Sequence, residues 1–155
     1  MKKPGKTDKF VVSACLAGKP CRYDGGTFDF PSIRSLVEQG LAVPVCPEEL
    51  GGLPTPRIPS EIVDGDGRDV LDEKARVLSQ EGGDVTDAFL RGAREALRIA
   101  REAGATEAIL KAKSPSCGRK LIHDGHFQGG LVEGMGVTAA LFEREGIPVR
   151  DEDSI

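Results

Sequence analysis

The segment FVVSAC, residues 10–15, is a short apolar strand that leads directly into a cysteine. Two further cysteines follow short apolar segments in the same way, Cys46 after LAVPV and Cys117 after AILKAKSPS. In an open parallel α/β sheet, ligands bind in the crevice beyond the carboxyl ends of the strands. We therefore expect the thiols of Cys15, Cys46 and Cys117 to converge on one point. Such an arrangement suits a metal or iron–sulfur centre with one position left open for chemistry.

Outward from this segment, strand and helix patterns alternate along the chain. The predicted strands are residues 10–14, 41–45, 107–111 and 147–150, and the predicted helices are residues 31–39, 84–103 and 136–145. This alternation predicts one domain over residues 1–155, a three-layer, Rossmann-like α/β fold with a mainly parallel sheet of about four strands. Because parallel crossovers are nearly always right-handed, the loops that follow the strands should share one edge of the sheet.

Four stretches depart from the alternation. The proline-rich segment CPEELGGLPTPRIP, residues 46–59, is predicted to be a functional loop without regular structure. Residues 61–80 contain three strand-like pieces, EIVDG, RDVLD and ARVLSQ, and are predicted to be a small hairpin insertion. LIHDGHFQGG, residues 121–130, is predicted to be two short extended pieces about an Asp-Gly turn. Residues 1–8 are predicted to be a flexible leader.

The composition disfavours several classes of function. The net charge of −4 gives no general attraction to phosphate backbones or anionic lipid. Aromatic residues make up 5% of the chain and tryptophan is absent, so platforms for stacking on single strands are scarce. The sequence shows neither a secretory signal nor an apolar run long enough to span a bilayer. We therefore expect a cytoplasmic protein that binds neither polymeric nucleic acid nor a membrane.

Four cysteines also allow two disulfides or inert positions in the core. A reducing cytosol disfavours the disulfides, and the polar, glycine-rich surroundings of the cysteines favour a role as ligands. Cys21, six residues after Cys15, matches neither C-x-x-C nor zinc-finger spacing, so its role stays open. Lys111 and Lys113 either lower the pKa of the Cys117 thiol or remain solvated charges.

The segment CPEELGG sets a thiol and a carboxylate two residues apart. Pro47 restricts the backbone between Cys46 and Glu48, so their relative position should be well fixed. A carboxylate beside a metal-bound substrate is a reasonable general base, whereas the plainer alternative is an exposed acidic turn. The two histidines, His123 and His126, flank an Asp-Gly turn and are not expected to share a metal ion.

Several motifs together resemble one family. The segments SACLAGKPCRYDGG, CPEELGGLPTPR, GGDVTDAFLRGA, LKAKSPSCG and HDGHFQGGLVEGMGVTAALFEREGIPV are similar to the bacterial 2-thiouracil desulfidase family, over about Val11 to Val149. This resemblance implies an α/β fold that carries a [4Fe-4S] cluster held by Cys15, Cys46 and Cys117. One iron then has no protein ligand and is free to bind the sulfur of a thiocarbonyl.

The resemblance also implies an enzyme, a desulfidase that converts a small thiolated base such as thiouracil to the oxo compound and releases sulfide without net electron transfer. Glu48 is expected to deprotonate the attacking water, and Ser114 to hydrogen-bond the substrate or to relay a proton. The family more often has tyrosine at the position of His123, which makes a different substrate preference conceivable. Arg57 and Asp124 are candidates for the pocket that holds the base.

Two other classes of protein remain open from the residues. If the sulfur of Cys21 reaches the fourth iron, the cluster is closed, and a cluster carrier or an electron-transfer module is favoured. Four cysteines are also a common ligand set for structural zinc.

Overall fold

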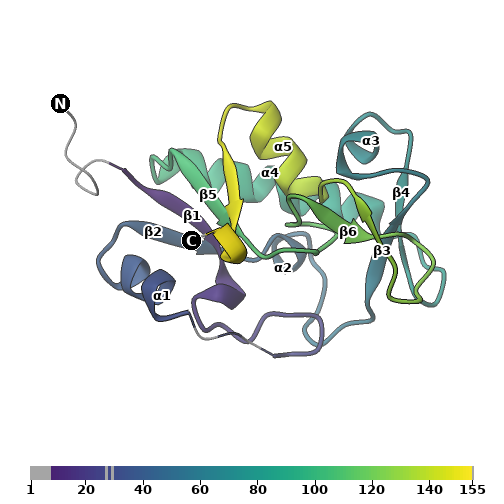
Figure 1. The fold of residues 1–155 in the computed structure, drawn as a ribbon, viewed down its shortest axis with the longest axis horizontal. Coiled ribbons are helices and arrows are strands. Elements are labelled where there is room, and N and C mark those ends of the chain that lie inside the picture. Colours follow the sequence, from purple (N-terminus) through teal and green to yellow (C-terminus); the bar gives the residue numbers. More distant parts are fainter. Residues whose placement is uncertain (1–7, 27, 29, 155) are drawn as a thin grey trace.

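A four-stranded parallel sheet forms the centre of the computed structural model, which describes residues 8–26, 28 and 30–154 (Figure 1). The strand order is β2-β1-β5-β8. The strands are β1 (Phe10–Ser13), β2 (Ala42–Val45), β5 (Glu107–Leu110) and β8 (Val149–Asp151). Each neighbouring pair is parallel, so all four strands end at the same edge of the sheet.

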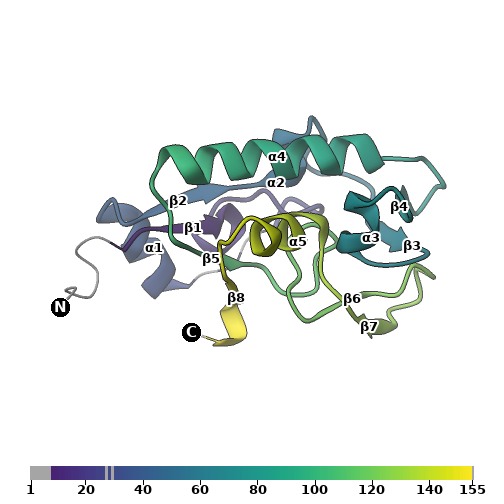
Figure 2. The same cartoon turned by 90° about the horizontal axis from the view of Figure 1, so that it is seen from above.

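Helices cover both faces of this sheet and make three layers (Figure 2). Helix α1 (Pro31–Glu38) lies on one face, and helices α4 (Thr86–Glu102) and α5 (Val137–Arg144) lie on the other. Alternate residues of β1 supply the two cores, because successive side chains of a strand point to opposite faces. Val12 packs in the cluster that contains Ile33 of α1, whereas Val11 packs with residues of α4 and α5. The predicted three-layer α/β fold is confirmed.

The chain changes direction across the sheet at β1. From β1 it passes through α1 to β2 on one side, and from β2 it returns through α4 to β5 on the other side. The carboxyl ends of β1 and β5 therefore flank the point where the strand order reverses. Open α/β sheets bind their ligands at such a switch point.

Two small antiparallel pairs pack together beside the sheet, at the right of Figure 1. One joins β3 (Ser60–Val63) to β4 (Arg76–Ser79), and the other joins β6 (Leu121–His123) to β7 (Leu131–Glu133). They share a third apolar core, in which Ile62 and Ile122 pack near Phe89 of α4. Short helices complete the described chain: η1 (Ala14–Leu16), α2 (Pro47–Leu50), α3 (Gly67–Leu71) and η2 (Glu152–Ser154).

The predicted strands and helices of the sheet are confirmed within two residues at their ends, and two local predictions are wrong. Residues 46–59 are not wholly irregular, because Pro47 occupies the first turn of α2, where its missing N–H costs nothing. RDVLD is helical rather than a strand, because Asp66 and Asp69 form a reciprocal capping box at the start of α3. The second extended piece of the last hairpin is β7, just beyond the predicted stretch.

The predicted leader, apart from Asp8, lies outside the described residues. No helix within the described ranges combines the length and the apolar character that a membrane span requires.

Helix α2 is pressed directly against α4. A Cβ atom on Gly92 of α4 would lie 1.8 Å from the carbonyl oxygen of Pro47, and one on Gly51 would lie 2.0 Å from that of Ala88. Real Cβ atoms do not come within 3.0 Å of such atoms, so the two backbones touch only because both residues are glycine. This contact fixes the helix that begins directly after Cys46.

We expect Gly92→Ala to destabilise the protein by roughly 2 kcal/mol or more, because the new methyl group must push α4 away from α2. Urea denaturation of the metal-free protein measures this change. The matched control is Arg94→Ala on the exposed side of the same helix, which should change stability by less than about 0.5 kcal/mol. Equal stability of the two variants would contradict the backbone contact.

Candidate active site

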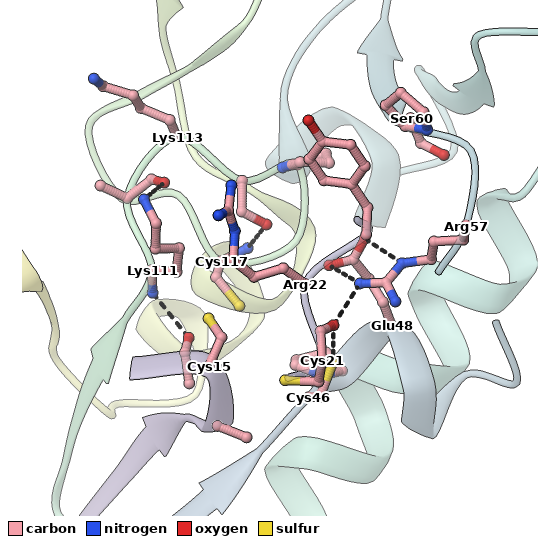
Figure 3. Close-up of a pocket in the computed structure, with 18 of the residues that line it drawn as sticks. Cys15, Cys21, Arg22, Cys46, Glu48, Arg57, Ser60, Lys111, Lys113 and Cys117 are labelled. Atoms are coloured by element: carbon pink, nitrogen blue, oxygen red, sulfur yellow. Dashed lines mark hydrogen bonds and ion pairs between the residues drawn. The ribbon is translucent and has the colours of Figure 1, made fainter. Parts of the chain in front are cut away.

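A cavity of about 390 Å³ opens beyond the carboxyl ends of β1, β2 and β5 (Figure 3). Its lining includes all four cysteines of the chain, together with Glu48, Arg57 and Ser114. Its position is the switch point of the sheet, where the topology places a ligand site.

Three separate strand ends bring the predicted cysteines together. Cys15 lies in η1 directly after β1, Cys46 precedes the first turn of α2 directly after β2, and Cys117 lies in the loop that follows β5. Figure 3 shows the sulfur atoms of Cys15 and Cys117 pointing toward one another. The structure therefore gathers at one cavity the three residues that the sequence singled out. Their role as ligands stays a prediction.

Cys21 lies in the same cavity and is almost completely buried, with 2% of its surface exposed. Its thiol interacts with the thiols of Cys15 and Cys46, and the interaction with Cys15 is the largest influence on its pKa. The backbone carbonyl of Cys21 accepts a hydrogen bond from the sulfur of Cys46, at 3.6 Å. Cys21 thus packs against the predicted ligands, so its role has to be tested separately.

The thiols of Cys21, Cys46 and Cys117 hold their protons tightly in the metal-free protein. Burial raises the pKa of Cys117 to about 12. The hydrogen bond with the Cys15 thiol raises the pKa of Cys21 to about 12. The pKa of Cys46 is also raised, first by its hydrogen bond with Cys21 and then by burial. Metal binding at these thiols would release protons, as thiolate ligation always does.

Of the roles that the sequence left open for Lys111 and Lys113, a lowering of the Cys117 pKa is not the one that the structure supports, because the pKa of that thiol is raised. Lys111 forms an ion pair with Glu152 at 2.8 Å and donates to the carbonyl of Ala112, so its charge is already neutralised. Burial instead dominates the environment of Cys117, which is 4% exposed.

The two adjacent carboxylates of α2 have different partners. Glu48 lines the cavity and is held by the guanidinium group of Arg57. Glu49 instead accepts a hydrogen bond from Thr55 at 2.5 Å and pairs with Lys19. The side chain of Glu48 is 17% exposed, so it is not the exposed acidic turn that the sequence left open.

Ser114 combines a place on the cavity wall with a fixed orientation. Its hydroxyl oxygen accepts hydrogen bonds from the backbone N–H groups of Ser116, at 3.0 Å, and Cys117, at 3.1 Å. A serine hydroxyl has two acceptor positions and one donor. With both acceptor positions used, the hydroxyl proton is what Ser114 can offer to a ligand.

The small hairpins supply part of the cavity wall. Ser60 and Glu61 of β3, which the sequence did not identify, and His123 of β6, which the resemblance singled out, belong to the lining. The carboxylate of Glu61 accepts hydrogen bonds from the N–H groups of Gly125, at 2.9 Å, and Phe127, at 3.2 Å. The signal in the sequence was the glutamate inside the apolar strand SEIV, because a buried carboxylate requires hydrogen-bond partners.

The structure does not support Asp124 as part of the pocket that would hold the thiolated base. Asp124 is not among the residues that line the cavity, and its carboxylate accepts the backbone N–H of His126 within its own turn. Arg57 does line the cavity, but its guanidinium group binds protein atoms.

The donor set fits a multi-iron group better than a single ion. Among the described residues, no group of three or more cysteine, histidine, aspartate or glutamate side chains is arranged to hold one metal ion. A tetrahedral zinc site, whose four ligands surround one ion at about 2.3 Å, is therefore not preformed. Thiols distributed around a cavity of about 390 Å³ suit a cluster whose separate irons each take one thiolate.

Comparison with known proteins identifies a family. A family model described as 2-thiouracil desulfurase matches residues 10–154. The uncharacterized protein YbbK of Bacillus subtilis (strain 168) is 45% identical over 145 residues, which cover 94% of this chain and 96% of that protein. A solved structure described as the [4Fe-4S]-dependent thiouracil desulfidase TudS is 42% identical, with a TM-score of 0.84, and the match covers 96% of this chain and 93% of that one.

We expect the metal-free protein to lose stability between about pH 9 and pH 12. The native state holds the proton of Cys117 up to a pKa of about 12, whereas the ordinary value is 9.0. The unfolded chain therefore loses that proton first, and the contribution of Cys117, complete below pH 9, falls as pH rises. Denaturation at a series of pH values measures the slope. Cys117→Ala should show a shallower loss, and an equally steep one would contradict this assignment.

Proposed function

This chain belongs to the 2-thiouracil desulfurase family, and on that premise we propose that it is an iron–sulfur-dependent, non-redox desulfidase. It removes sulfur from a small thiolated pyrimidine, such as thiouracil, and releases sulfide. The observation that carries the proposal is one cavity lined by Cys15, Cys46 and Cys117, with the carboxylate of Glu48 on its wall. The similar solved structure, described as a [4Fe-4S]-dependent thiouracil desulfidase, supports both the cofactor and the substrate class.

Cys15, Cys46 and Cys117 would hold the cluster as thiolates, each from a different strand end. When bound, the cluster supplies an iron without a protein ligand, a Lewis acid for the sulfur of the thiocarbonyl group. The rigid supports of the three cysteines suit this task. The sheet fixes Cys15 and Cys46 through the paired ends of β1 and β2, and Ser114 holds the backbone N–H of Cys117.

Glu48 is the general base for the attacking water. Its carboxylate accepts a proton from the water, and the water oxygen forms a bond to the thiocarbonyl carbon. The carbon–sulfur bond then breaks, and the sulfur leaves as hydrosulfide. Thiocarbonyl and water thus give carbonyl and hydrogen sulfide, with no oxidant or reductant.

Ser114 donates a hydrogen bond to the substrate rather than relaying a proton. Its oxygen already accepts two backbone N–H groups, so a relay would first have to break one of these bonds. As a donor, Ser114 orients the substrate beside Glu48, where correct placement of the reacting atoms contributes directly to the rate.

Anaerobic reconstitution with iron and sulfide, followed by incubation with 2-thiouracil and 4-thiouracil, tests the proposal. We expect the absorption of a [4Fe-4S] protein, and release of sulfide with formation of uracil in equal amounts. A loaded cluster with no sulfide from either base would contradict the substrate class. Colourless protein with stoichiometric zinc after anaerobic purification would contradict the cofactor.

The burial of Cys21 beside the predicted ligands favours one alternative, a closed cluster in a carrier or an electron-transfer protein. We expect Cys21→Ser to retain the iron content, the absorption spectrum and the sulfide-releasing activity, because three other cysteines hold the cluster. The matched variant Cys46→Ser should lose most of the iron. A loss of iron in Cys21→Ser as large as that in Cys46→Ser would instead support the alternative, because a closed cluster depends on all four cysteines.

A further inference from the structure

The guanidinium group of Arg57 is completely engaged inside the protein, next to the site. Its side chain is 6% exposed. A guanidinium group carries five N–H donors, and five contacts to protein oxygens are present here. They reach both carboxylate oxygens of Glu48, the carbonyls of Cys21 and Pro54, and the hydroxyl of Thr55. Arg57 therefore has no donor to offer to a substrate unless one of these contacts breaks.

Two of the five contacts form a fork on Glu48. The Nε atom of Arg57 donates to Oε2 of Glu48 at 3.3 Å, and Nη2 lies 3.3 Å from Oε1. A two-point contact between planar groups fixes the plane of the carboxylate as well as its position. A glutamate side chain without such a partner would move among several rotamers.

The remaining contacts attach this fork to the rest of the site. Nη2 also donates to the carbonyl of Cys21 at 3.1 Å, and the backbone N–H of Arg57 donates to the carbonyl of Tyr23 at 2.6 Å. Nη1 donates to the carbonyl of Pro54 and the hydroxyl of Thr55, at 3.2 and 2.9 Å. Arg57 thus connects α2, the loop after β1 and the loop after α2 (Figure 3).

We propose that Arg57 is a positioning residue that holds the carboxylate of Glu48 in the orientation needed to take a proton from the attacking water. The inference rests on the proposed function, because it acts through the proposed base. Lysine cannot replace arginine here, since an ammonium group is a single point of charge without the planar fork. The role assigned to Arg57 is therefore orientation, beyond charge alone.

Kinetics of the reconstituted enzyme test the proposal. We expect Arg57→Lys to lower kcat about 10- to 100-fold, because small misplacements of a reacting group have effects of this size. KM should change much less, and the iron content and absorption spectrum should match those of the wild type. In Arg57→Ala, added guanidinium ion at non-denaturing concentration should restore part of kcat. Wild-type kcat in Arg57→Lys would overturn the proposal.

A double-mutant cycle shows whether Arg57 acts through Glu48. Glu48→Gln alone should lower kcat by about 10²- to 10⁴-fold, the usual contribution of a general base. Adding Arg57→Lys to Glu48→Gln should lower kcat no further, because residues that act as a unit are not additive. Multiplied losses in the double variant would overturn the positioning role.

Thermal unfolding of the metal-free variants gives a readout that does not depend on turnover. The double variant should lower Tm by less than the sum of the two single variants, and strict additivity would overturn the contact. The control is Arg144→Lys. Arg144 pairs with Asp72 on the surface, so this variant should change neither kcat nor the result of the double-mutant cycle. Wild-type enzyme that holds a cluster but releases no sulfide would contradict the proposed function itself, whereas normal turnover in Arg57→Lys contradicts only this inference.

Discussion

The parallel pairing of β1 with both of its neighbours is the constraint on which the site depends. Ser13 at the end of β1 lies opposite Val45 at the end of β2, so the residues that follow both strands emerge together. On the other side, the hydroxyl of Ser13 accepts the backbone N–H of Lys111 at 2.8 Å and ties the end of β1 to the end of β5. An antiparallel neighbour would put its cysteine at the opposite edge, more than 10 Å away for a strand of four residues at about 3.3 Å each.

The cavity lies at the border between a core of the sheet and the core of the small hairpins, and each part of the chain supplies different residues to its wall. The sheet and its helices supply the cysteines and Glu48, whereas the small hairpins supply Ser60, Glu61 and His123 on the wall. The hairpins have their own core and their own hydrogen bonds, so their residues can change without moving the strand ends. His123, for which the sequence suggested an effect on substrate preference, lies on this separable wall.

Local sequence patterns were sufficient to predict the sheet, but they did not predict the part of the cavity wall that the hairpins supply. The strands and helices of the sheet carry strong periodicity, and a cysteine follows each of three strands. The structure of α3 depends on one reciprocal contact between Asp66 and Asp69, which outweighs the strand-like composition of RDVLD. The place of β3 beside the cysteines depends on packing against β6, some 60 residues later, which no local pattern records.

The contact between Arg57 and Glu48 shows the same limit of local sequence patterns. It also shows how the charges of the site balance. Glu48 lies in α2, and Arg57 lies nine residues later in the proline-rich loop that follows, so their contact depends on the turn geometry. The negative charge of Glu48 disfavours the thiolates of Cys46 and Cys117, although a general base beside the cysteines has to carry that charge. A positive charge held 3.3 Å away offsets the repulsion, because opposite charges attract. One buried arginine therefore compensates the charge that Glu48 brings to the cavity of the cysteines.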